Sequence, residues 1–397
     1  MLLYPATDRQ ARFIALAASL VPALQARAAE HDRSGTFPVE NIADIRAARY
    51  QALPVPERFG GLGANLLETC LAQMELGRAD GSTALTLNMH LATIGSAGAS
   101  MPWPEPVYER ICRAVADGAL INSAATEPEL GSPASGGLPA TRAHRDGEGW
   151  RINGHKTYVS GCDVLTWFLV PAVLEGTDPP ATAVFLVPNG HPGLRIERTW
   201  DTIAMRASGS DDIYLDDVTL PEDAMIVRRR PGEADTRGPY GAAWGPLLVS
   251  SVYLGVATAA RDQALRFART RVPTALGHPI ADLPAIQWKA AEMEIALITA
   301  RTLVLSAAED WGNLPERRAE LSPRIAVAKT VAINQAIATT DIAMRITGGA
   351  GLSRGHPLER AFRDVRAGLT HPPLEDRAKE ALGKAALASI QLPATFA

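Results

Sequence analysis

Two histidines carry the clearest potential for acid–base chemistry in this chain of 397 residues. An imidazole has an unperturbed pKa of about 6.5, so it can take or give a proton near neutral pH. His371 stands directly before Pro372-Pro373, and His90 ends the stretch Leu87-Asn88-Met89-His90. His371 could act as a base or acid, or only cap a loop. His90 could steer a proton, or be a core residue whose ring nitrogens are both satisfied.

A glycine-rich element offers a second kind of chemistry, the binding of phosphate groups. Gly348, Gly349 and Gly351 have no side chains, so backbone amides there could approach a pyrophosphate closely. The pair Gly348-Gly349 could equally well only end a helix. The basic run Arg228-Arg229-Arg230 precedes Pro231-Gly232, and we interpret it as a solvated loop rather than a phosphate patch.

Composition and charge exclude several classes of protein. Cys70, Cys112 and Cys162 are widely spaced, which predicts no metal site and suits a reducing compartment. The net charge of −4 argues against a nucleic-acid partner. The N-terminus lacks the pattern of a signal peptide, and the longest mainly apolar stretch, residues 247–260, is too short to span a bilayer. We therefore predict a cytoplasmic protein with no metal, nucleic-acid or membrane partner.

The elements that must position these residues change in character twice along the chain. Residues 1–119 are rich in helix-forming Ala, Leu and Arg, most clearly at 11–30. Residues 120–233 contain short apolar runs separated by turns such as Asn153-Gly154, which predicts a compact sheet or barrel. These runs are 150–153, 166–173, 182–187, 194–196 and 212–215. No βαβ alternation or GxGxxG motif is present, so a Rossmann domain is not expected.

Helical periodicity returns in residues 234–397. An apolar stripe with spacings of three and four runs from Ile286 to Ala307, and Pro284 gives that helix a start. A second striped helix opens at Ser322-Pro323 and ends before Gly348. Long striped helices with short connections predict a bundle. The sequence thus predicts an α+β fold, mainly α, with domains 1–119, 120–233 and 234–397.

Five motifs resemble those of the acyl-CoA dehydrogenase superfamily, and they occur in the family's order. Residues 125–132, ATEPELGS, resemble its T-E-P-x-x-G-S loop, and residues 152–160, INGHKTYVS, resemble its I-N-G-x-K-x-[WY]-[IV]-[TS] segment. Residues 56–63, PERFGGLG, resemble P-E-x-x-G-G-x-G. Residues 345–351 and 358–364 resemble Q-x-x-G-G-x-G and P-[LV]-E-[RK]-x-x-R-D. Each motif alone is weak, but their order over 54–364 identifies the chain as a divergent member.

The resemblance implies a fold and a cofactor. The fold would be an N-terminal helical domain, a middle β domain and a C-terminal four-helix bundle, and the cofactor would be FAD, with FMN less expected. Hydroxyls of Thr126 and Ser160 would bond the flavin ring, and Tyr158 would pack on it. Arg271 or Arg269 would meet the pyrophosphate, together with the glycine element of a neighbouring subunit. The implied cofactor-binding residues are Ser123, Ala125, Thr126, Gly131, Ser132, Tyr158, Val159, Ser160, Arg271, Arg345, Gly348 and Gly349.

The chain departs from the family pattern at the catalytic base. The family's usual glutamate falls on Pro372, and an alternative glutamate position falls near Gly245. Neither residue can accept a proton. His371 adjoins the first position, and oxygen-using flavin hydroxylases related to this superfamily place a histidine in a similar stretch. They also place one near His90, with Ser160 as a third partner.

Three functions stay open at this point. The first is oxidation of an acyl-CoA or related thioester, with His371 taking the proton, hydride passing to flavin N5, and Ser132 holding the substrate's phosphate end. The second is a flavin monooxygenase that uses His371 or His90. The third is a flavin-loaded binding protein without turnover. The electron partner would be an electron-transfer flavoprotein, a flavin reductase or O2, and the assembly would be a homodimer or homotetramer.

Overall fold

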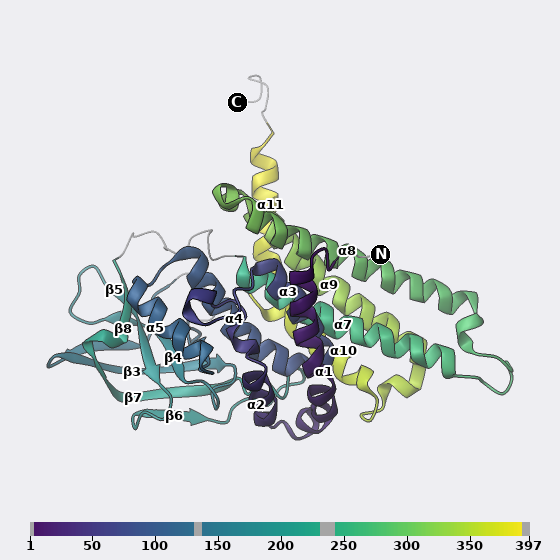
Figure 1. Ribbon diagram of the computed structural model, residues 1–397, viewed down its shortest axis with the longest axis horizontal. Coiled ribbons are helices and arrows are strands. Elements are labelled where there is room, and N and C mark those ends of the chain that lie inside the picture. Colours follow the sequence, from purple (N-terminus) through teal and green to yellow (C-terminus); the bar gives the residue numbers. More distant parts are fainter. Residues whose placement is uncertain (1–3, 131–136, 231–242, 391–397) are drawn as a thin grey trace.

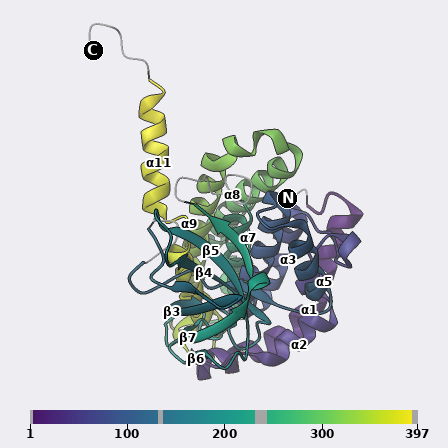
Figure 2. The ribbon, with the colours of Figure 1, turned by 90° about the vertical axis from the view of Figure 1, so that its left-hand side faces the viewer.

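The computed structural model describes residues 4–130, 137–230 and 243–390. The strands form one side of the molecule, and the N- and C-terminal helices pack together on the other (Figure 1). Seen after a quarter turn, the sheet stands in front of the helices and the last helix, α11, projects away from the body (Figure 2).

The N-terminal helices are α1 (Asp8–Ser34), α2 (Val39–Ala47), α3 (Leu66–Ala79), α4 (Gly81–Ser100) and α5 (Glu105–Ala116), with the 3-10 turns η1 (Tyr50–Ala52) and η2 (Glu57–Phe59). Polar caps fix where α3 and α4 begin. Asn65 and Glu68 form a reciprocal capping box at α3, and the side chain of Asp80 caps α4. Helices α3 and α4 are buried along almost their whole length, so they form the centre of the helical part.

Helix α1 is the one helix in the described ranges that is long and apolar enough to cross a membrane. It packs instead along α3 through Phe13, Leu20 and Leu24, which are buried in the main core. Its first turn is tied to the α3 capping box, because Arg9 donates to Glu68 at 2.8 Å. Helix α1 therefore packs as one of the helices of the helical domain.

The sheet contains β1 (Ile121–Ser123), β2 (Arg142–Asp146), β3 (Gly149–Val159), β4 (Trp167–Leu174), β5 (Ala181–Pro188), β6 (Leu194–Glu197), β7 (Asp211–Pro221) and β8 (Met225–Arg229), with the turn η4 (Glu222–Ala224). The order is β6-β7-β3-β2-β4-β5-β8, and β1 pairs with β4 off this path. The β2–β4 and β1–β4 pairs are parallel and the others antiparallel. The sheet is thus mixed.

The C-terminal helices are α7 (Trp244–Thr270), α8 (Pro284–Asn313), α9 (Ser322–Thr347), α10 (Pro357–Asp364) and α11 (Glu375–Ala388), with turns η5 (Ile280–Asp282), η6 (Pro315–Leu321), η7 (Gly348–Leu352) and η8 (Val365–Thr370). Helix α7 packs on α3, α4, α8 and α9, so it connects the two helical regions. Helix α11 packs on α9, and Ala378 is its buried residue.

The predicted α+β, mainly α fold is confirmed, but one local interpretation was wrong. Arg228 and Arg229 do not lie in a loop: they end β8 and pair with Ala183 and Thr182 of β5. Backbone hydrogen bonds to β5 hold these two arginines in a strand, although their charges favour a solvated loop. The short strand β2 was also not foreseen, because it is polar apart from Ala143 and lacks the apolar alternation that marks a strand.

Candidate active site

Six of the predicted cofactor residues lie together where β1 and β3 end. Ser123 closes β1 and is exposed, and Ala125 and Thr126 follow it. The Thr157 amide donates to the Thr126 carbonyl at 2.9 Å, which fastens this loop to β3. Tyr158, Val159 and Ser160 continue directly from Thr157. The structure therefore brings two segments some 30 positions apart into one surface.

Tyr158 has an unusual backbone and an exposed ring. Its φ is +58° and its relative exposure is 66%. A bulky residue in the left-handed region costs on the order of 1–2 kcal/mol, and such strain collects at functional sites. The ring meets Trp200 edge to face, with centroids 6.2 Å apart at 88°. This pair presents an aromatic surface of the kind that packs against a flat heterocycle.

A buried row of hydroxyls lies behind Tyr158. Ser160 Oγ is 2.9 Å from Ser210 Oγ, which is 2.8 Å from Ser208 Oγ. Asn122 Nδ2 donates to the Ser160 carbonyl at 3.2 Å. The buried Thr157 Oγ1 has no hydrogen-bond partner within the described ranges. Short hydroxyls with spare hydrogen-bonding capacity beside an exposed aromatic ring fit the polar edge of a flavin.

A buried ion pair holds the loop that carries Thr126. Lys156 Nζ lies 2.6 Å from Glu127 Oε1 and donates to the Pro171 carbonyl at 2.7 Å. Both charged side chains are almost fully buried. Burial alone would raise the pKa of Glu127, but hydrogen bonds from Lys156 and Thr141 outweigh it and leave the pKa below its ordinary value. The pair fixes the loop against β3 and β4.

His371 follows η8 and is bonded to a tyrosine of α7. Its Nε2 lies 2.9 Å from the Tyr253 hydroxyl. Burial, and then the charge of Lys329, lowers the pKa of His371 to about 4, whereas burial raises the pKa of Tyr253 well above its usual value. Tyr253 therefore keeps its proton, and its hydroxyl donates to Nε2 when the histidine proton is on Nδ1 and accepts from Nε2 when the proton is there.

Two further ionisable groups are buried around this pair. Lys329 of α9 is buried, and its Nζ donates to the Gly368 carbonyl at 3.2 Å. Burial lowers the pKa of this lysine. Asp364 ends α10, accepts from the Met205 amide at 2.7 Å, and has its pKa raised to about 7 by burial. Glu375, four positions after His371, pairs with Lys379 at 2.6 Å and accepts from Asn334.

His90 lies in α4, and backbone groups form hydrogen bonds with both of its ring nitrogens. Its Nε2 is 3.0 Å from the Gln51 carbonyl, and its Nδ1 accepts from the Ile121 amide at 3.1 Å. Burial lowers its pKa to about 4, so the ring is neutral. With both nitrogens engaged between η1, α4 and β1, we interpret His90 as a structural residue.

The remaining predicted cofactor residues lie at the ends of C-terminal helices or fall outside the described residues. Arg271 caps the end of α7, and Arg345, Gly348 and Gly349 lie at the exposed end of α9. Phe267 near the end of α7 contacts His356 with ring centroids 6.4 Å apart, so the end of α7 lies close to the start of α10, which follows the glycine turn η7. They lie far from the sheet within one chain (Figure 1). Gly131 and Ser132 fall outside the described residues.

Several residues at the site were missed from the sequence. Tyr253 and Lys329 lie in mainly apolar helical stretches, and Lys329 is the one charged residue between Arg324 and Asp341, which is a usable signal. Trp200, Ser208 and Ser210 stand in a segment between strands that carries no periodic pattern. Only the folded sheet places them beside Tyr158 and Ser160.

Family models match most of the chain in order. The acyl-CoA dehydrogenase N-terminal domain matches residues 7–99, the middle domain residues 122–218 and the C-terminal domain residues 247–375.

Individual relatives cover nearly the full length. Putative acyl-CoA dehydrogenase YdbM of Bacillus subtilis (strain 168) is 40% identical over 95% of this chain and 97% of its own. Amino sugar nitrososynthase DnmZ of Streptomyces peucetius is 31% identical over 93% of this chain and 91% of its own. The structure of KijD3 with FMN and a dTDP-amino-keto sugar matches with a TM-score of 0.86 at 31% identity, over 98% of this chain and 96% of that one.

Proposed function

Because the chain belongs to the acyl-CoA dehydrogenase family, and is thus a flavin-dependent oxidoreductase, we propose that it works as a monooxygenase. One observation carries this proposal. Where the family resemblance expects a catalytic carboxylate, the chain has Pro372, and the adjoining His371 is a neutral ring held by Tyr253.

The residues present suit a bound flavin. Tyr158 and Trp200 offer an exposed aromatic surface, and Ser160, whose hydroxyl lies 2.9 Å from that of Ser210, follows Tyr158 by two positions. In its reduced form a flavin reacts with O2 and can transfer one oxygen atom to a substrate while the other leaves as water. This chain's own residues would orient the ring and exclude water.

In this proposal His371 acts as a hydrogen-bond donor. The proposed role has Tyr253 donate to Nε2, 2.9 Å away, so that the histidine proton sits on Nδ1, where it would be available to an oxygen atom of substrate or cosubstrate. A ring with a pKa of about 4 is a weak base and gives little driving force for removing a proton from carbon. The geometry therefore supports oxygen chemistry better than thioester dehydrogenation. Relatives named nitrososynthases favour the same choice.

A second candidate is the oxidation of an acyl thioester at its α,β carbons. It is favoured by the 40% identity to a putative acyl-CoA dehydrogenase. It would need the neutral His371 to accept the α-proton despite its lowered pKa.

The cofactor we propose is FAD, held between two subunits. Arg271, Arg345 and the exposed Gly348 and Gly349 lie at the end of the helices remote from the sheet, where an adenine dinucleotide of a neighbour would find cations and open amides. The outer face of α8 exposes Trp288 to 71%, which suits a buried position in an oligomer. Heat release of the cofactor followed by chromatography distinguishes FAD from FMN.

Two measurements on the holoenzyme test the reaction class. We expect oxygen uptake that rises when a suitable small amine, sulfide or aromatic compound is added with reduced flavin. We also expect no loss of visible flavin absorbance when the oxidised holoenzyme meets a panel of acyl-CoAs without oxygen. Bleaching by any thioester in that panel would overturn the monooxygenase proposal in favour of the dehydrogenase.

A further inference from the structure

The motif at residues 358–364 has no part in the proposed function, although it ends in a buried carboxylate. Its last residue, Asp364, is 2% exposed and ends α10. Asp364 Oδ1 accepts a hydrogen bond from the backbone amide of Met205 at 2.7 Å. Met205 is fully buried and lies in the segment that joins β6 to β7. A side chain of the C-terminal helices therefore holds a segment of the sheet domain.

Met205 has an unfavourable backbone conformation. Its φ is +52°, in the left-handed region that a residue with a Cβ rarely adopts. Its amide donates to Asp364, and its carbonyl accepts from Trp200 Nε1 at 2.8 Å. Loss of the acceptor at Asp364 would leave a buried amide unpaired, and relaxation of the backbone would then turn the carbonyl away from the indole.

The orientation of the Trp200 ring depends on this carbonyl. The backbone amide of Trp200 donates to Asp211 Oδ1 at 2.9 Å, which fixes the main chain but not the ring. Nε1 is the one polar atom of an indole, so its bond to Met205 is the hydrogen bond that can orient the ring. The indole meets Tyr158 edge to face. Two hydrogen bonds thus connect Asp364 to the aromatic surface of the candidate site.

The acceptor at Asp364 does not depend on its charge. Burial outweighs the hydrogen bond from Met205 and the charge of Arg360, and it raises the pKa of Asp364 to about 7. Both protonation states therefore occur near neutral pH, and in both a carboxyl oxygen can accept from an amide. Asparagine offers the same oxygen without a charge, whereas alanine offers no acceptor.

We propose that Asp364 is a positioning residue of the flavin site. Through Met205 it holds Trp200 in the orientation against which the flavin packs, and it acts without touching the flavin itself. The inference rests on the flavin position proposed above. It adds to that site a residue of α10, which the proposed function leaves without a role.

The dissociation constant of the flavin tests this in the full-length holoenzyme, read from the fluorescence of flavin released on dilution. We expect Asp364→Ala to weaken binding about fivefold, the size of one hydrogen bond, and Asp364→Asn to bind as tightly as the wild type. Trp200→Phe breaks the same connection at its other end and should weaken binding by a similar factor. Adding Asp364→Ala to Trp200→Phe should cause no further loss, because the two residues act in series.

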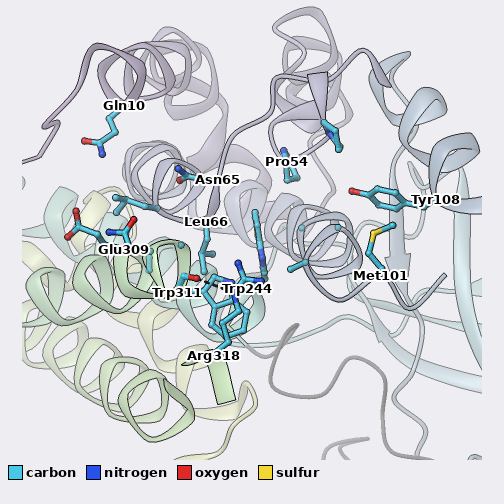
Figure 3. Close-up of a pocket in the computed structure, with 18 of the residues that line it drawn as sticks. Gln10, Pro54, Asn65, Leu66, Met101, Tyr108, Trp244, Glu309, Trp311 and Arg318 are labelled. Atoms are coloured by element: carbon cyan, nitrogen blue, oxygen red, sulfur yellow. Dashed lines mark hydrogen bonds between the residues drawn. The ribbon is translucent and has the colours of Figure 1, made fainter. Parts of the chain in front are cut away.

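Fluorine NMR of protein labelled with 5-fluorotryptophan reports the surroundings of the indole directly. The Trp200 resonance is the one that disappears in Trp200→Phe. We expect Asp364→Ala to shift this resonance and Asp364→Asn to leave it in place. Trp244 and Trp311 line a cavity among the helices (Figure 3), and their resonances are internal references that should not move.

Wild-type flavin affinity in Asp364→Ala or in Trp200→Phe would overturn the proposal, and so would an unmoved Trp200 resonance in Asp364→Ala. Equal losses from Asp364→Ala with and without Trp200→Phe would also overturn it, since Asp364 would then act by another route. If Asp364→Ala does not fold, Trp200→Phe still decides the outcome, because it keeps the carboxylate.

Tyr158→Ala separates failure of this inference from failure of the proposed flavin position. Wild-type affinity in Tyr158→Ala would overturn both. Weak binding in Tyr158→Ala together with wild-type affinity in Asp364→Ala would overturn only the role of Asp364. None of these measurements needs turnover, so an absence of oxygen uptake would overturn the monooxygenase alone.

Discussion

At the Tyr253–His371 contact, the proposed function has the tyrosine hydroxyl donate to Nε2, 2.9 Å away, which leaves the histidine proton on Nδ1. Tyr253→Phe removes the donor to Nε2. Because that donor favours the neutral ring, its loss raises the pKa of His371 from about 4, and it frees the proton to move from Nδ1. We expect the rate of oxygen turnover to fall about tenfold, which is the effect of misplacing one group that handles a proton. We also expect the acid limb of the pH–rate profile to move to higher pH.

Tyr50→Phe is the matched control for that substitution. Tyr50 is fully buried, and its hydroxyl donates to Gln73 at 2.9 Å rather than to a histidine. Rates and flavin content measured from pH 5 to 8 distinguish the two variants. Parallel pH profiles for wild type and Tyr253→Phe would mean that Tyr253 only supports packing.

His90 provides a test of a structural histidine. The unfolded chain protonates it near pH 6.5 and the folded chain only near pH 4, so unfolding takes up a proton between these values. The folded state therefore loses stability from this group as the pH falls from 6.5 to 4, by about 1.4 kcal/mol per pH unit. His90→Gln keeps one donor and one acceptor but cannot titrate.

We expect denaturant unfolding at pH 6 and pH 5 to show a smaller loss of stability in His90→Gln than in the wild type, by about 1.4 kcal/mol. The raised pKa of Asp364 gives an opposite slope, but it is common to both proteins and cancels in the difference. Identical slopes would show that His90 is not buried in its neutral form. Loss of oxygen turnover beyond the loss of folded protein would return His90 to the catalytic residues.

At the scale of elements, the Glu127–Lys156 pair joins the loop after β1 to strand β3. Lys156→Met leaves the buried Glu127 carboxylate without its cation, which typically costs about 3–5 kcal/mol. We expect the free energy of unfolding to fall by that amount. We also expect weaker flavin binding, because Thr126 lies in the loop that the ion pair holds in place. The double variant Lys156→Met/Glu127→Gln removes both charges and should recover part of the stability. Full stability in the single variant would contradict this assignment.

An element can be predicted from the sequence when the residues that determine it lie within it or directly beside it. Helix α8 follows its apolar stripe from Pro284, and α9 ends at Gly348, because both signals are local. Strand β8 was missed because its pairing with β5 comes from residues 40 positions away. The Tyr158–Ser160 end of the site could be predicted from the motif, whereas Trp200 and Ser210 reach it only through the β3–β7 and β6–β7 pairings.

At the scale of the whole molecule, α7 separates the two halves of the predicted flavin site. Its 27 residues span about 40 Å, from Trp244 beside α4 to Thr270, and Arg271 follows. Tyr158 and Ser160 lie at the sheet, and Gly349 lies at the remote end of the bundle (Figure 1). In the arrangement that we propose, the sheet of one subunit and the helix ends of another together hold one flavin.

Mixed oligomers test that arrangement. Tyr158→Ala removes the exposed ring at the sheet, and Gly349→Val blocks close approach of a phosphate, while a Cβ at Gly349 meets no described atom within 4 Å. Both variants should fold, and each alone should bind little flavin. In a refolded equal mixture half of the dimers are mixed, and each has one intact site of two, so flavin content should recover to about a quarter of wild type. Flavin absorbance after removal of free cofactor measures this. If the mixture holds no more flavin than the single variants, each site is built from one chain, and Arg271, Arg345, Gly348 and Gly349 lose their proposed role.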